Sequence, residues 1–277
     1  MPEHHLPEPI DLELILLGTG TSTGVPVLAC DCAICRSEDP RDKRLRTSAL
    51  IRVNGHTYVF DSGPDFRTQL IREQVNDLDA ILFTHAHRDH IAGLDDVRAF
   101  NYVLNKTIHI YASQEVEQSI RNEFPYIFRD DGYFGRPRID IHTLHNEPFD
   151  LDGITVFPIL VKHHLLDVFG YRIGELGYIT DASSIEEEEI EKLKGCKVLV
   201  INALRKSRHI SHFSTEEAFA LIAQINPEVA IITHMSHFIG KHEDLFHEFP
   251  PRVLPGYDGM RLQISGSKVK LLPPTWY

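Results

Sequence analysis

Residues 84–90, THAHRDH, decide how the rest of this 277-residue sequence is interpreted. They place His85, His87, Asp89 and His90 directly after an apolar run that is typical of a buried strand. Side chains alternate along a strand, so His85 and His87 can point the same way, while Asp89 and His90 fall in the following turn. Imidazole and carboxylate groups are ligands for divalent transition metals. The stretch therefore predicts a metal centre at the end of a strand.

Other polar candidates follow the ends of other apolar runs. They are His163, Asp181 and His234, and Asp61 ends a further run, TYVFDSG. Rigid strands that deliver ligands from their ends build a preorganised site. His164 stands next to His163, and the residues alone leave open which of the two is the ligand. The sequence thus indicates that several strand ends contribute to one site.

A second group of metal-binding residues is CDCAIC, which contains Cys30, Cys32 and Cys35. Cysteine thiolates bind zinc, and a tetrahedral zinc site takes four ligands. The chain has one further cysteine, Cys196, which lies in the apolar run CKVLVIN and is predicted to be part of the core. The motif therefore supplies three ligands, and the fourth must come from another part of the chain.

Composition places the chain among globular proteins, with 42% hydrophobic and 25% charged residues. The formal net charge of -12 argues against nucleic acid as a partner, because backbone binding depends on basic surface. The sequence lacks the pattern of a signal peptide and any apolar run long enough to span a bilayer. Clustered cysteines then favour a reducing compartment. We expect a cytoplasmic protein with no membrane partner.

Short apolar strands alternate with helical segments. The strands are expected at 12–18, 48–53, 57–63, 108–112, 153–161, 169–181, 196–202 and 228–234. Helices are expected at 93–104, at 184–194 and from Ser214, where Glu217 completes a capping box. Residues 125–150, rich in glycine and proline, are expected to form a loop. No repeat or linker divides the chain, so 1–277 is predicted to be a single domain of mixed α/β type.

Taken together, these motifs resemble a known family. THAHRDH, preceded by LLGTGTSTGVP and FDSG, resembles the metallo-β-lactamase fold superfamily. The cysteine cluster and THMSH (233–237) resemble the PhnP-type cyclic phosphodiesterases of the carbon–phosphorus lyase pathway. The resemblance extends from about Leu14 to Met260. It implies an α+β fold, a four-layered αββα sandwich of two mixed β-sheets flanked by helices.

The resemblance also implies a set of ligands for two metals. The first metal would be held by His85, His87 and a third histidine, the second by Asp89, His90 and His234, and both would share Asp181. By its spacing to FGYRIG, the third histidine is His163 rather than His164.

Four more residues receive roles from the resemblance. His237 would complete a closed Cys₃His zinc site, which is structural because no position is open. Asp61 would orient a ligand histidine or its loop. His212, in RHISHFS, would contact the phosphate and protonate the leaving oxygen. The role of His209 stays open.

We therefore expect a metal-dependent hydrolase, a phosphodiesterase for a small cyclic or diester phosphate, acting through a hydroxide that bridges two metals. Asp89 and His212 are the expected catalytic residues. The cofactors would be two divalent metals, Zn or Mn with Fe as a further option, and one structural Zn. The resemblance also allows a homodimer.

Three alternatives remain. Other enzymes of the superfamily hydrolyse lactams, lactones or thioesters, or process RNA 3′ ends, and the latter usually carry basic surface. The accessory proteins of pyrroloquinoline-quinone biosynthesis have a similar cysteine cluster, but their metal motif tends to be incomplete.

Overall fold

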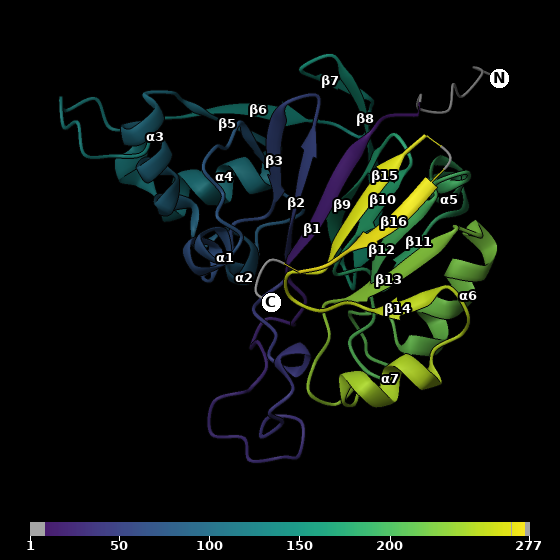
Figure 1. Ribbon diagram of the computed structural model, residues 1–277. Helices are drawn as coiled ribbons and strands as arrows, with labels where there is room; N and C mark the ends of the chain where they lie inside the picture. Colours follow the sequence, from purple (N-terminus) through teal and green to yellow (C-terminus); the bar gives the residue numbers. More distant parts are fainter. Residues whose placement is uncertain (1–8, 267, 275–277) are drawn as a thin grey trace.

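The computed structural model describes residues 9–266 and 268–274, and in it two β-sheets lie face to face (Figure 1). The first sheet has the order β16-β15-β1-β2-β3-β4-β5-β6. Its strands are β16 (Lys268–Leu272), β15 (Arg261–Ser265), β1 (Leu12–Gly18), β2 (Ser48–Val53), β3 (His56–Phe60), β4 (Ala80–Leu82), β5 (Ile108–Ser113) and β6 (Ile139–Leu144). The pairs from β16 to β3 are antiparallel and those from β3 to β6 are parallel, so the sheet is mixed.

The second sheet has the order β11-β8-β9-β10-β12-β13-β14, with β7 paired to β8. Its strands are β7 (Phe149–Leu151), β8 (Ile154–His163), β9 (Leu166–Ile173), β10 (Leu176–Ile179), β11 (Ser184–Ile185), β12 (Val198–Asn202), β13 (Val229–Thr233) and β14 (Val253–Pro255). The pairs up to β10 are antiparallel, and β10, β12, β13 and β14 are parallel. The carboxyl ends of these parallel strands meet at one edge of the sandwich.

Helices cover the outer face of each sheet (Figure 1). On the first sheet lie α1 (Phe66–Arg72), α2 (Arg88–Ile91), α3 (Arg98–Leu104) and α4 (Gln114–Glu123), and on the second α5 (Glu187–Leu193), α6 (Thr215–Ile225) and α7 (His242–Glu248). Single-turn helices lie at η1 (Pro40–Asp42), η2 (Leu94–Val97) and η3 (Pro125–Phe128). Separate apolar cores fill the space between the sheets and under each helical layer. The expected αββα arrangement is confirmed.

Two expectations about local structure are wrong. The strand expected at 169–181 is divided by a turn at Gly174 into β9 and β10, which pair antiparallel. Residues 125–150 were predicted to be loop, but they contain β6 and β7. In β6, Ile139 and Ile141 alternate with polar residues, which is the period of a half-buried strand. The glycines and prolines that suggested a loop lie before Ile139 or just before β7, where they end elements rather than interrupt them.

The long connection between β1 and β2 carries the three cysteines and projects below the sheets in Figure 1. It is held at its base, where Val25 and Arg44 exchange backbone hydrogen bonds of 2.8 and 2.7 Å. In the described part of the chain, no helix combines the length and apolar character that crossing a membrane requires.

Candidate metal centres

The predicted ligands gather where the strands of both sheets end. His85 and His87 follow β4, His163 is the last residue of β8, Asp181 follows β10, and His234 follows β13. The motif continues into α2, a single turn that carries Asp89 and His90. Gly63 permits this packing, because a Cβ there would clash with the carbonyl oxygen of Asp89. The fold thus brings residues from four strands to one point.

The ligand atoms form two groups that share Asp181. One group is His85, His87, His163 and Asp181, and the other is His90, Asp181 and His234; within each, the ligand atoms lie within 4.8 Å of one another. Asp181 Oδ2 lies 3.5 Å from His85 Nε2 of the first group and 3.4 Å from His90 Nε2 of the second. Asp181 Oδ1 lies 2.8 Å from His234 Nδ1. The carboxylate therefore faces both groups at once.

Asp89 lies beside the second group, with its Oδ2 3.3 Å from His90 Nε2. His163, and not His164, belongs to the first group. His164 is exposed and its amide N–H donates to Ser183 Oγ over 3.0 Å. The structure thus separates the two adjacent histidines that the sequence left open.

In four of the histidines, a protein group holds one ring nitrogen and leaves the other for a ligand role. His90 Nδ1 lies 2.7 Å from Asp61 Oδ2, and His163 Nδ1 donates to the Ser211 carbonyl over 2.6 Å. His85 Nδ1 lies 3.0 Å from Thr84 Oγ1, and His234 Nε2 lies 3.1 Å from Thr21 Oγ1. Such outer contacts fix the tautomer and orientation of metal-binding imidazoles.

Asp61 connects two of these contacts. Besides facing His90, its carboxylate accepts from the backbone N–H and the hydroxyl of Thr84, both over 2.8 Å. Thr84 in turn contacts His85, so one buried carboxylate positions a histidine of each group. These are the contacts that the orienting role predicted for Asp61 requires. Thr84, Thr21 and the Ser211 carbonyl were not identified from the sequence, although Thr84 stands within the quoted motif.

These residues fit a pair of divalent cations. His85 Nε2, His90 Nε2 and His234 Nδ1 are buried and have no hydrogen-bond partner among the described residues. Each such orphaned group costs about 1–3 kcal/mol unless something binds it. Bonds of about 2.0–2.2 Å at tetrahedral angles place neighbouring ligand atoms roughly 3.3–3.6 Å apart. The separations of 3.3–3.5 Å between the histidine and carboxylate atoms match this spacing.

The backbone at the site is strained. Asp61, Asp181 and His234 have φ values of 62°, 56° and 54°, in the left-handed region that non-glycine residues rarely adopt. Each follows a strand directly or after one residue, and the turn aims its side chain across the sheet edge. Strain of this kind costs on the order of 1–3 kcal/mol per residue and concentrates at functional sites.

Neighbouring buried charges shift the pKa values of Asp181 and His90 in opposite directions. Burial alone would raise the pKa of Asp181, but His234 and His90 outweigh it and hold that pKa well below its usual range. Burial would lower the pKa of His90, but Asp181 and Asp61 outweigh it and raise that pKa. Asp181 is therefore an anion at the centre of the site, available to cations on both sides.

His212 lies against the cluster without belonging to either group. Its ring centroid is 4.6 Å from that of His163 and 4.8 Å from that of His234. Its Nδ1 is buried and has no hydrogen-bond partner among the described residues. His209, in contrast, bonds locally, with its Nδ1 3.2 Å from Ser211 Oγ. Of these two, His212 is the one whose ring stacks against a predicted ligand of each group.

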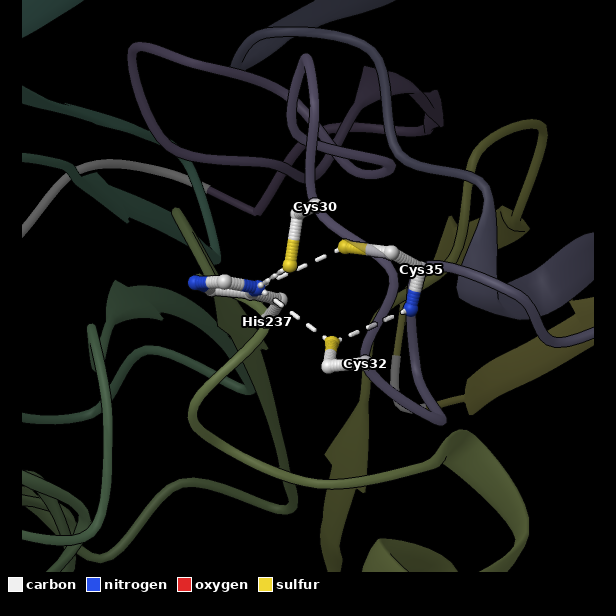
Figure 2. Close-up of side chains that lie close together, drawn as sticks. All are labelled: Cys30, Cys32, Cys35 and His237. Atoms are coloured by element: carbon white, nitrogen blue, oxygen red, sulfur yellow. Dashed lines mark hydrogen bonds between the residues drawn. The ribbon is translucent and has the colours of Figure 1, made fainter.

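The three cysteines meet His237 in a second cluster (Figure 2). The Sγ atoms of Cys30, Cys32 and Cys35 lie 3.3, 3.5 and 3.4 Å from His237 Nδ1. Zinc bonds of about 2.3 Å to sulfur and 2.0–2.1 Å to nitrogen put tetrahedral neighbours roughly 3.5 Å apart. The amide N–H of Cys35 donates to Cys32 Sγ over 3.4 Å, and this contact helps lower the pKa of Cys32 to about 6. The four residues fit one closed zinc site.

Backbone hydrogen bonds connect the loops that carry the two metal centres. His237 stands three residues after His234, and the segment between them pairs with the start of the cysteine loop. The amide of Met235 donates to the Thr19 carbonyl over 2.9 Å, and the amide of Thr21 donates to the Met235 carbonyl over 3.2 Å. Thr21 also contacts the His234 ring. A zinc in the Cys₃His cluster would therefore steady the loop that presents His234.

A small hollow of about 70 Å³ opens beside the first group and is lined by His85 and His87 together with Ser113, Glu115 and Asp167. A neighbouring hollow of about 370 Å³ is also lined by these last three residues and extends to His145, but it contains none of the predicted ligands. A larger cavity, about 620 Å³, lies between α1 and α3 and contains none of the predicted ligands. The groove at His85 is therefore the better candidate for substrate.

Comparison with known proteins agrees with the fold and the motif. The model of the "Beta-lactamase superfamily domain" matches residues 56–235. The crystal structure of a diphosphatase from the PhnP family superposes with a TM-score of 0.86 and 34% identity, over 95% of this chain and 99% of that one.

Two curated relatives carry other names. An octanoyltransferase of Porphyromonas gingivalis is 40% identical over 94% of this chain, but the chain spans only 53% of that protein's length. A ribonuclease Z of a Mycobacterium species is 24% identical over 80% of this chain and 84% of its own. Both activities are properties of those proteins, and they define alternatives for this one.

Proposed function

The chain belongs to the beta-lactamase superfamily, on its PhnP branch, and we propose that it is a metal-dependent phosphodiesterase that cleaves a small cyclic or diester phosphate. The observation that carries the proposal is the carboxylate of Asp181, which two groups of ligand atoms share, with Asp89 beside the second group. Two divalent cations held by these groups, Zn, Mn or Fe, would supply Lewis acidity, lower the pKa of a bound water and neutralise phosphate charge.

Residues of the chain supply negative charge beside the cations, orient the ligand rings and contact the phosphate. Asp181 and Asp89 place negative charge beside the cations, and Asp61 fixes the rings that face them. His212 adjoins both His163 and His234, so it can touch a phosphate oxygen held between the two groups. Burial, and then the neighbouring His234, lowers the pKa of His212 to about 3, so the free site holds it neutral. An anionic phosphate beside the ring favours its protonated form.

Replacing His212 with alanine tests the proton-donor role. An alkoxide leaving group needs a proton near neutral pH, whereas nitrophenolate leaves without one. We expect H212A to lose roughly 10²–10⁴-fold in kcat on an alkyl or cyclic diester, and less than about tenfold on a nitrophenyl diester. Steady-state kinetics at matched metal content compare the two. Equal losses on both substrates would contradict the role.

The groove at His85 and His87 favours a small substrate. The hollow that these two histidines line has a volume of about 70 Å³, and the neighbouring hollow that shares Glu115 and Asp167 has about 370 Å³, so the space beside the ligands suits a small molecule. The net charge of -12 disfavours a long RNA backbone. We therefore keep RNA 3′-end processing, the activity that the Mycobacterium relative is named for, as an alternative with less support. The accessory role is also less favoured, because every predicted ligand position of both groups is filled.

Acyl-ester or thioester hydrolysis is the second candidate, because the Porphyromonas relative is named an octanoyltransferase. Transfer through an acyl-enzyme would need a nucleophile. Cys30, Cys32 and Cys35 face His237, and Cys196 is buried with 3% exposure. No cysteine therefore presents a free thiol at the groove. An acyl substrate would instead have to be hydrolysed at the metal centre.

The deciding experiment measures turnover of the purified protein, reloaded with Zn or Mn, on two sets of substrates. One set holds cyclic ribose phosphates, bis-nitrophenyl phosphate, a diphosphate ester and a short RNA; the other holds lactones, octanoyl esters and octanoyl thioesters. We expect cleavage of small phosphate esters that a chelator abolishes and metal restores. Cleavage of the acyl set alone at full metal occupancy would overturn the proposal, and cleavage of RNA alone would favour the processing role.

A further inference from the structure

A third group of ligating side chains lies away from the strand ends, on β5 and β6. The parallel register pairs His109 with Asp140 and Tyr111 with His142. Paired residues of a parallel ladder share a face and alternate residues of one strand do too, so His109, Asp140 and His142 project on the same side. All three side chains are at least partly exposed. None of them belongs to either centre described above.

The three ligand atoms converge. His109 Nδ1 lies 2.9 Å from His142 Nε2, and the two nitrogens lie 3.8 and 3.7 Å from Asp140 Oδ2. The point equidistant from these atoms is about 2.0 Å from each, the length of a bond from zinc to imidazole or carboxylate, and it lies in their plane. The two imidazoles are hydrogen-bonded to each other in this arrangement, so a tetrahedral cation would need small side-chain rotations that separate the two nitrogens and bring the carboxylate closer.

Aromatic stacking restrains one of the three ligand side chains, His142. The ring of Tyr111 stacks on His142, with centroids 4.6 Å apart and planes at 16°. Tyr111 also stacks on Phe149 of β7, with centroids 5.3 Å apart, and so connects His142 to the hairpin of the second sheet. The ring of His142 is therefore packed against Tyr111, whereas His109 and Asp140 are exposed to solvent.

We propose that His109, Asp140 and His142 form a peripheral site for a divalent transition cation such as Zn²⁺. Two imidazoles and one carboxylate are a donor set for Zn²⁺, Co²⁺, Ni²⁺ and Cu²⁺ rather than for Mg²⁺ or Ca²⁺. Three protein ligands leave further positions to water. Because β6 is the last strand of the first sheet, a cation here would cross-link this edge strand to β5. The site is independent of the phosphodiesterase proposal.

Titration with Zn²⁺ alone tests the site. The protein is first loaded at the two-metal and Cys₃His centres, and further Zn²⁺ is added in a calorimeter. We expect one additional equivalent per chain in the wild type. H109A and H142A should weaken its binding by on the order of a hundredfold or more, since even outer-shell changes cost 10–100-fold. H145A, which removes an exposed histidine just beyond β6, is the matched control and should retain the equivalent.

A second readout does not depend on stoichiometry. With the other centres filled, one equivalent of Cu²⁺ at this site should show an electron paramagnetic resonance spectrum with two imidazole nitrogens, and H109A should leave at most one. Excess Zn²⁺ should also raise the Tm of the wild type and of H145A, but not of the double variant H109A/H142A. The proposal is overturned if the wild type takes up no additional Zn²⁺, or if the double variant takes up the same amount.

Discussion

Replacing Asp181 with alanine is expected to empty the two-metal centre and to lower kcat on a phosphodiester by at least about 10³-fold. Asp181 is the one side chain that belongs to both ligand groups, and its Oδ2 lies 3.5 and 3.4 Å from a histidine of each. Its loss removes a bond from each cation and the anion that offsets their charge. Inductively coupled plasma mass spectrometry measures the metal content, and steady-state kinetics on the same sample measure kcat.

The Cys₃His cluster provides an internal control for this variant. It shares no ligand with the two groups, so D181A should still hold one zinc per chain if the fold is intact. D181N retains the side-chain volume and one carbonyl oxygen, and it should recover part of the metal but little of the turnover. D131A, at an exposed loop aspartate, should behave as the wild type. Full turnover in D181A with both metals retained would refute the shared role of this carboxylate.

The sequence was most informative where ligands are neighbours along the chain. His85, His87 and His90 come from one motif, so their meeting needs only a strand followed by a turn. Asp181 and His234 were placed through the resemblance, and the structure brings both to the same strand edge. The left-handed backbone at these two residues has only a weak signal in the sequence, since aspartate and histidine adopt it more often than most residues but far less often than glycine. Which nitrogen of each histidine is free depends equally on distant partners such as Ser211 and Thr21.

Elements with a local signal were the predictable ones. The helix after Ser214 has its predicted capping box with Glu217. The helix α4 has a comparable local signal, because Ser113 caps it and Val116 and Ile120 share its buried face. The hairpin of β15 and β16 is different, because it completes the first sheet by pairing β15 with β1 from the other end of the chain. Such long-range pairing is not encoded in any window of sequence.

Replacing Cys32 with serine is expected to release the zinc of the Cys₃His cluster and to loosen the loop that carries it. A hydroxyl is a poor zinc ligand, and three donors no longer close a tetrahedron. The loop is also fastened at Val25 and Arg44, so we expect residues 26–43 to open while the sheets remain folded. Limited trypsin digestion should then cut within this segment, at Arg36, at least about a hundredfold faster than in the zinc-loaded wild type.

The effect on turnover follows from the contact between the two centres. Because Thr21 and Met235 join the cysteine loop to the segment that presents His234, loss of the zinc should lower turnover about tenfold or more and weaken the second metal position. C196S provides the matched control. Its thiol is buried in the core under α5, away from the loop, so this variant should lower the Tm but retain its zinc, its resistance to trypsin and its kcat. If C32S keeps a full zinc equivalent, Cys32 is not a required ligand. If its loop stays resistant to trypsin after the zinc has gone, packing rather than metal holds this segment against the active edge of the sheets.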